Sequence, residues 1–128
     1  MPDELYLVFR AAGEEFALPA AQVREIVTVH DCTDAVNVRG AVLPVVAAAR
    51  VPAKRGCVIV VEARERRLGL LVDRIASVVK IEPEKISSNP DPPSRRLPLC
   101  RVGRVRLHGR FKHVLDPNLL PACLPDAS

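Results

Sequence analysis

Short strand-like segments recur along the whole chain, about every 8 to 12 residues, and this spacing restricts the possible folds more than any other feature. The segments are rich in Val, Leu, Ile and Phe, and clusters of Gly, Pro or polar residues separate them. Almost no long helical pattern interrupts the series. The sequence therefore predicts an all-β protein in which closed or nearly closed barrels hide the strand edges.

About nine strands are predicted, joined by tight turns and a few longer loops. The predicted strands are residues 5–9, 15–18, 24–29, 41–46, 57–62, 68–72, 75–81, 104–108 and 110–115. Pro44 indicates that the fourth strand is an edge or carries a bulge. The predicted turns and loops are residues 12–14, 39–40, 51–56, 65–67 and 109.

Only short helices are predicted. Single helical turns are expected at residues 20–23 and 83–85, and Asp116 followed by Pro117 is typical of a capped short helix. Residues 86–96 contain several prolines, which cannot donate ladder hydrogen bonds, and are predicted to form a surface loop.

The length and composition fit one globular domain spanning residues 1–128. The chain starts without a basic, apolar signal segment, and its longest apolar run is far shorter than the roughly 20 residues that span a bilayer. We therefore expect a cytoplasmic protein without membrane insertion. Its four cysteines are scattered, which favours reduced, structural thiols.

No catalytic, metal or cofactor site is evident. The serines lack the Gly-x-Ser-x-Gly setting of a nucleophile, and the C-terminal glycines lack phosphate-binding spacing. His30 and Cys32 lie close together, but a closed metal site needs four ligands and no second pair stands nearby. The sequence predicts a protein that is not an enzyme.

A basic segment leaves one alternative open, a nucleic-acid-binding barrel. Seven cations and no acid lie between Asp91 and Asp116. The strand period predicts a basic surface at Arg104, Arg106, Arg110 and Lys112. Aromatic residues for stacking are few, which makes nucleic acid an unlikely partner and an ordinary solvated face the simpler interpretation.

Five blocks of sequence, in order, resemble the CheW family of chemotaxis coupling proteins. The blocks are residues 7–9 with 15–19, 23–27, 37–46 (Asn-Val-Arg-Gly-Ala-Val-Leu-Pro-Val-Val), 68–75 (Leu-Gly-Leu-Leu-Val-Asp-Arg-Ile) and 114–120 (Val-Leu-Asp-Pro-Asn-Leu-Leu). The resemblance implies two small SH3-like five-stranded β-barrel lobes packed side by side and no enzymatic activity. It also implies three partners: the tip of a methyl-accepting chemoreceptor, a CheA-type histidine kinase, and other CheW-like proteins in array rings.

Carried over by position, the resemblance implies a receptor-binding groove between the lobes. Its candidate residues are Val23, Glu25, Arg39, Gly69, Ile75 and Val78. The three apolar side chains could form walls for a helical hairpin, Gly69 could allow close approach, and Glu25 with Arg39 could form an ion pair at the rim. The alternative from the residues alone is ordinary core and a solvated surface pair.

The chain departs from the family pattern between Ile26 and Arg39, where the family has roughly ten further residues. This favours a divergent, shortened, FrzB-like member that still binds receptors but binds the kinase weakly or not at all. Gly40 is the one candidate kinase contact, and it lies beside this shortened segment. A full coupling protein that bridges receptor and kinase remains the alternative.

Overall fold

The computed structural model describes residues 4–32, 34–51 and 53–124, and these form ten strands and three short 3-10 helices. The strands are β1 (Glu4–Ala11), β2 (Glu14–Pro19), β3 (Val23–Cys32), β4 (Ala35–Val38), β5 (Ala41–Ala47), β6 (Ala53–Ala63), β7 (Arg66–Val72), β8 (Arg74–Ile81), β9 (Arg101–Leu107) and β10 (Arg110–Leu115). The helices are η1 (Ala20–Gln22), η2 (Pro83–Lys85) and η3 (Pro117–Cys123).

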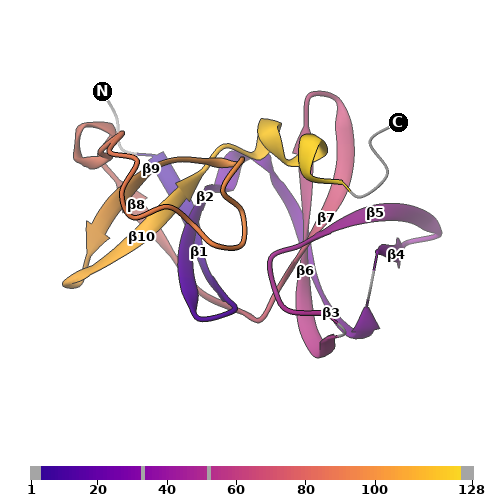
Figure 1. The fold of residues 1–128 in the computed structure, drawn as a ribbon. Helices are drawn as coiled ribbons and strands as arrows, with labels where there is room; N and C mark the ends of the chain where they lie inside the picture. The colour runs from indigo at the N-terminus through magenta and orange to yellow at the C-terminus, as the bar shows by residue number, and fades with distance from the viewer. Residues whose placement is uncertain (1–3, 33, 52, 125–128) are drawn as a thin grey trace.

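Two five-stranded sheets lie side by side (Figure 1). The first sheet has the strand order β8-β1-β2-β10-β9, and the second has the order β3-β6-β7-β5-β4. Most neighbours are antiparallel, but β10 runs parallel to β2 and β5 runs parallel to β7. The predicted all-β class with two five-stranded lobes is confirmed.

The largest apolar cluster lies between the two sheets and contains residues of both. Phe9 and Phe16 pair across β1 and β2, and their rings stack with centroids 5.2 Å apart. The second sheet contributes Ile59 and Leu70, and η3 adds Leu120, all fully buried. Burying a side chain of this size contributes roughly 1.5–3 kcal/mol, so this cluster holds the sheets together.

Several predicted turns are confirmed by backbone conformations that few residues adopt. The β4–β5 turn at Arg39 and Gly40 and the β9–β10 turn at His108 and Gly109 both have two successive positive φ angles. This geometry matches the twist of a two-residue hairpin. The β6–β7 turn is also tight, but it lies at Arg64 and Glu65, so the predicted separator at residues 65–67 was placed too late.

Three predictions about the second sheet are wrong. Strand β4 was missed, because its four residues follow a polar cluster and give too short a pattern. Strand β6 begins at Ala53, inside the predicted loop 51–56, because pairing with β3 continues to Cys32. Strand β5 is internal: Pro44 is tolerated there because parallel pairing with β7 starts only at Val45.

Gly69 is a packing position in the second sheet. A Cβ atom at Gly69 would lie 2.6 Å from Val58 Cγ1 and 3.3 Å from Val45 Cγ2, closer than packed side chains allow. The glycine therefore lets neighbouring strands of the same sheet pack against each other. Gly69 is buried, so it does not provide the close approach to a partner that was expected.

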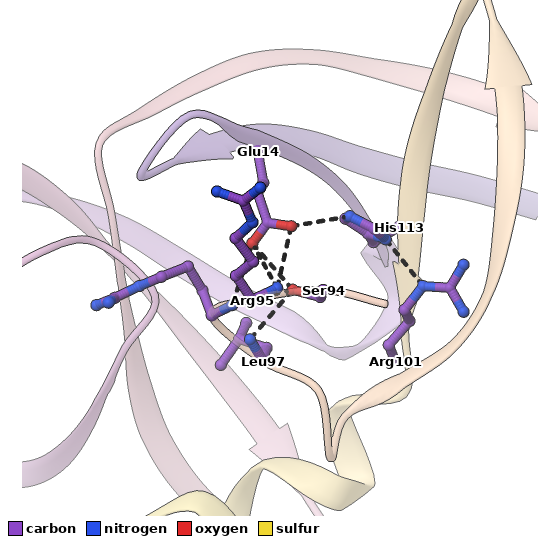
Figure 2. A network of polar contacts seen from close by, with 7 residues as sticks. Glu14, Ser94, Arg95, Leu97, Arg101 and His113 are labelled. Carbon is purple, nitrogen blue, oxygen red and sulfur yellow. Dashed lines mark hydrogen bonds and ion pairs between the residues drawn. The ribbon is translucent and has the colours of Figure 1, made fainter. Parts of the chain in front are cut away.

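The proline-rich loop after η2 is held against the first sheet. Ser87 exchanges two backbone hydrogen bonds of 2.8 Å with Arg104 of β9. The Glu14 carboxylate accepts hydrogen bonds of 3.1 Å from the Ser94 hydroxyl and from the backbone N–H groups of Arg95 and Arg96 (Figure 2). One carboxylate thus accepts from three donors of the loop.

His113 of β10 connects the same carboxylate to the start of β9. Its Nδ1 accepts a hydrogen bond of 2.8 Å from Arg101 Nε, so Nδ1 carries no proton (Figure 2). Its Nε2 lies 3.0 Å from Glu14 Oε2 and donates to it. Burial lowers the pKa of His113, Glu14 opposes this effect, and Arg101 adds to it.

This network predicts a pH-dependent stability. Because the pKa of folded His113 lies below that of the unfolded chain, the folded state binds fewer protons between the two values. The contribution of His113 is therefore complete above the unfolded pKa of about 6.5 and is lost progressively as the pH falls toward the folded pKa. Denaturant unfolding at roughly pH 7.5 and pH 5 should show a larger loss for the native chain than for His113→Gln.

His113→Gln is the matched control because it removes the titrating ring and leaves His30 and His108, which are exposed, in place. Equal losses of unfolding free energy in the two proteins would contradict this role of His113.

Candidate functional site

Apolar side chains of β3 and β8 lie at the margin of the core that the two sheets share. Within their sheets, Ile75 and Val78 of β8 pair with Phe9 and Leu7 of β1, both members of that core. Ile75 is half-buried against the core, whereas Val78 remains 57% exposed. Strand β8 therefore turns apolar side chains toward the second sheet, and one of them is not covered.

Strand β3 has the same arrangement in the second sheet. Val23 pairs with Val61 and Ile26 with Ile59, and both partners belong to the shared core. Val23 packs against that core, but Ile26 is 41% exposed. Because β3 and β8 are the edge strands of their sheets, these positions lie where the core ends. We call the four residues Val23, Ile26, Ile75 and Val78 the inter-sheet margin.

A recess adjoins the inter-sheet margin. It has a volume of about 720 Å³ and is lined by Glu4, Leu5, Pro19, Ala20, Ala21 and Gln22. Leu5 lies two residues before Leu7 on β1, so it points to the same face of the sheet, and it is 50% exposed. The uncovered apolar surface therefore extends from β8 and β3 to the start of β1.

The predicted ion pair exists but lies elsewhere. Arg39 Nε is 3.2 Å from Glu25 Oε1, and both side chains line a hollow of about 150 Å³. Glu25 pairs with Val60, on the face of the second sheet opposite to the one that carries Ile26. The pair therefore lies over the hollow on the inner face of the second sheet and does not border the inter-sheet margin.

The six residues expected in one groove thus separate into three groups. Val23, Ile75 and Val78 belong to the inter-sheet margin, Glu25 and Arg39 line the hollow, and Gly69 is buried within the second sheet. Ile26 was missed, although its alternation with Val27 along β3 places it on the same face as the core. Gly40 lies at the open tip of the β4–β5 hairpin, where an added Cβ atom would have no other atom within 4 Å.

The predicted basic surface is smaller than the sequence indicated. Lys112 is buried, and its Nζ lies 3.0 Å from Glu15 Oε1, so it belongs to the interior of the first sheet. Burial alone would raise the pKa of Glu15, but the hydrogen bond and charge of Lys112 outweigh it and lower that pKa. Arg110 also lies 3.7 Å from Glu15 Oε2. Strand alternation could not tell which face of β10 is covered.

Other cations of this segment bind backbone carbonyl groups. Arg96 donates to the carbonyls of Ala48 and Ala49 at 2.7 and 2.8 Å, and Arg104 donates to that of Asp91 at 2.8 Å. Arg104 and Arg106 also lie over the Phe111 ring, at 4.3 and 5.5 Å from its centroid. These contacts engage much of the positive charge within the protein and weaken the nucleic-acid alternative.

The described residues offer no metal site and no membrane-spanning helix. Among residues 4–32, 34–51 and 53–124, no group of three or more His, Cys, Asp or Glu side chains could hold a metal ion. In the same ranges, no helix is long and apolar enough to cross a membrane.

Two known proteins with similar sequences are both chemotaxis proteins. The chain is 31% identical over 106 residues to the probable chemotaxis protein CheW of Rhizobium etli, covering 70% of this chain and 68% of that protein. It is 30% identical over 102 residues to the chemotaxis protein CheW of Rhizobium meliloti, covering 66% of each chain. The chain thus aligns with about two thirds of the length of each relative.

A solved structure has the same fold. The scaffolding protein TtCheW from Thermoanaerobacter tengcongensis superposes with a TM-score of 0.72 over 91% of this chain and 85% of that one, at 23% identity. Residues 5–122 match the family described as the CheW-like domain. This match covers nearly all of the sequence and spans both sheets, and the chain belongs to the CheW-like domain family.

Proposed function

We propose that this protein is a non-catalytic chemotaxis scaffold of one domain that binds the cytoplasmic tip of a chemoreceptor at the inter-sheet margin. Membership of the CheW-like family supports the scaffold role. The exposure of Val78 and Ile26 at the end of the shared core is the observation that supports this binding site. Apolar side chains in such a position remain in water unless a partner covers them.

A receptor tip is a helical hairpin, and the margin suits such a partner. An amphipathic helix presents anchors three or four residues apart and buries them in an apolar surface. The margin offers side chains from two strands, and the recess beside Leu5 extends that surface along the first sheet. The flanking cation Lys80, which pairs with Leu5 across the ladder, supplies charge at the rim.

The proposal includes reduced binding of a CheA-type kinase. The segment that is shorter than in the family forms the end of β3 and the four residues of β4. It leads directly into the hairpin tip at Gly40, so the shortening falls beside the candidate kinase contact. The protein then acts mainly through receptors and through other CheW-like proteins in array rings, in the cytoplasm.

Val78→Asp should weaken receptor binding by at least about tenfold, since it sets an unpaired charge against an apolar partner. Titration of a receptor signalling fragment, followed by fluorescence anisotropy or calorimetry, measures this. Val42→Asp is the matched control: Val42 is an equally small, exposed valine, but it lies on the β4–β5 hairpin away from the first sheet (Figure 1). If both variants bind like the native chain, the margin is not the receptor site.

Arg39→Glu should lower receptor affinity by less than about threefold, because the Arg39–Glu25 pair faces the hollow and an exposed pair contributes little. The same titration measures it beside Val78→Asp. A loss as large as that of Val78→Asp would extend the receptor footprint across β3 to the hollow.

The kinase regulatory domain should bind with a Kd weaker than about 100 µM, whereas the receptor fragment binds in the micromolar range. The two titrations use the same protein preparation, so a folded, receptor-binding sample serves as the control. Kinase binding at low micromolar Kd would make the protein a full coupling protein that bridges receptor and kinase.

A further inference from the structure

Two cysteines that are 23 residues apart in the sequence meet in the fold. The Sγ atoms of Cys100 and Cys123 are 2.9 Å apart. Cys100 is fully buried just before β9, and Cys123 is half-buried at the end of η3. The sequence predicted scattered structural thiols, but this pair is in contact in the fold.

The backbone holds both members of the pair in place. The Cys100 carbonyl accepts a hydrogen bond of 2.9 Å from the N–H of Asp116, the N-cap of η3, and the Cys100 N–H donates to the Leu97 carbonyl at 3.2 Å. Leu120, in the middle of η3, is fully buried in the shared core. Both thiols are thus fixed by contacts other than their own, so their approach is a property of the fold.

The other two cysteines have no such neighbour among the described residues. Cys32 and Cys57 lie on the adjacent strands β3 and β6, but Cys32 pairs with Ala53 and Cys57 pairs with Thr28. Four positions of the ladder therefore separate them, which is too far for a disulfide bond. They provide internal reference thiols.

We propose that Cys100 and Cys123 form a reversible oxidative clasp, a disulfide bond made by hydrogen peroxide and opened by a dithiol reductant. Cys123 is the less buried of the two residues, and its sulfur attacks the peroxide as a thiolate, giving a sulfenic acid and hydroxide, which forms the first water with the proton of the Cys123 thiol. The Cys100 sulfur then attacks the Cys123 sulfur, the S–O bond breaks, and the oxygen leaves as water with the Cys100 proton. In total, two thiols and one peroxide give one disulfide and two waters.

Burial raises the pKa of the Cys100 thiol, and its hydrogen bond with Cys123 acts in the same direction. A buried thiol with a raised pKa reacts slowly with an oxidant in solution. This agrees with the assignment of Cys123 as the thiol that meets the peroxide first and of Cys100 as the resolving thiol.

The clasp would join the C-terminal segment to the first sheet covalently. The helix η3 packs on β6 and β5 of the second sheet, whereas Cys100 leads into β9 of the first sheet. Asn118 of η3 also accepts a hydrogen bond of 3.1 Å from Gln22, which precedes Val23 of the inter-sheet margin. Oxidation therefore fixes the two sheets relative to each other beside that margin.

The test is oxidation of the full native chain with hydrogen peroxide, followed by intact mass and non-reducing peptide mapping. We expect a mass loss of about 2 Da, one Cys100–Cys123 cross-linked peptide pair, free thiols at Cys32 and Cys57, and full reversal by dithiothreitol. The closed loop should raise the Tm by roughly 10 °C, and the reductant should abolish this rise.

Cys123→Ser and the matched control Cys57→Ser separate the clasp from general oxidation, because Cys57 is also half-buried but has no thiol neighbour. Cys57→Ser should keep the mass loss and the Tm rise, and Cys123→Ser should lose both. Stable sulfinic acid at Cys123 without a cross-link, a cross-link that includes Cys32 or Cys57, or thiols that do not react in the native chain would each overturn the proposal.

Discussion

The apolar layer between the two sheets is the contact on which the rest of this protein depends. Each sheet buries a smaller apolar cluster of its own on one face, but the other face is covered only where the two sheets meet. The stacked Phe9 and Phe16 rings meet side chains such as Ile59 and Leu70 from the other sheet, and η3 adds Leu120. The edge strands β3 and β8 border this contact, and the layer ends in water beside them.

A second constraint is the polar group that Glu14 organises. The loop between η2 and β9 has many prolines, and within it a few backbone N–H groups donate to nearby side chains, such as those of Ser94 and Asn89. Partial burial of a carboxylate is costly unless it is paired, and here the hydroxyl of Ser94, two backbone N–H groups and His113 satisfy the half-buried Glu14. One side chain from β2, far away in the sequence, therefore anchors the end of the loop, while Ser87 pairs its start with β9.

The sequence predicted what depends on local periodicity and failed where tertiary contacts decide. Nine of the ten strands and the Arg39-Gly40 turn follow from apolar patterning and from turn chemistry, and they are found. Strand β4 is too short to give a period, and the buried Lys112 depends on Glu15, a partner 97 residues away that no local pattern indicates. The network of Glu14 could not be predicted for the same reason.

The candidate site was predicted only in part, because a strand pattern shows which residues share a face but not which of them are covered. The resemblance to the family gave Val23, Ile75 and Val78, but alternation alone does not separate a buried apolar position from an exposed one on the same face. Ile26 and Ile59 face each other across a ladder, yet one is 41% exposed and the other is fully buried.

The distance from the centre of the shared layer decides the difference, since that layer thins toward β3 and β8. A surface that continues a core in this way keeps its shape without a partner, because its inner side is already packed. Binding there requires little ordering of the protein, so the affinity for a helical partner depends mainly on apolar complementarity at the few exposed positions.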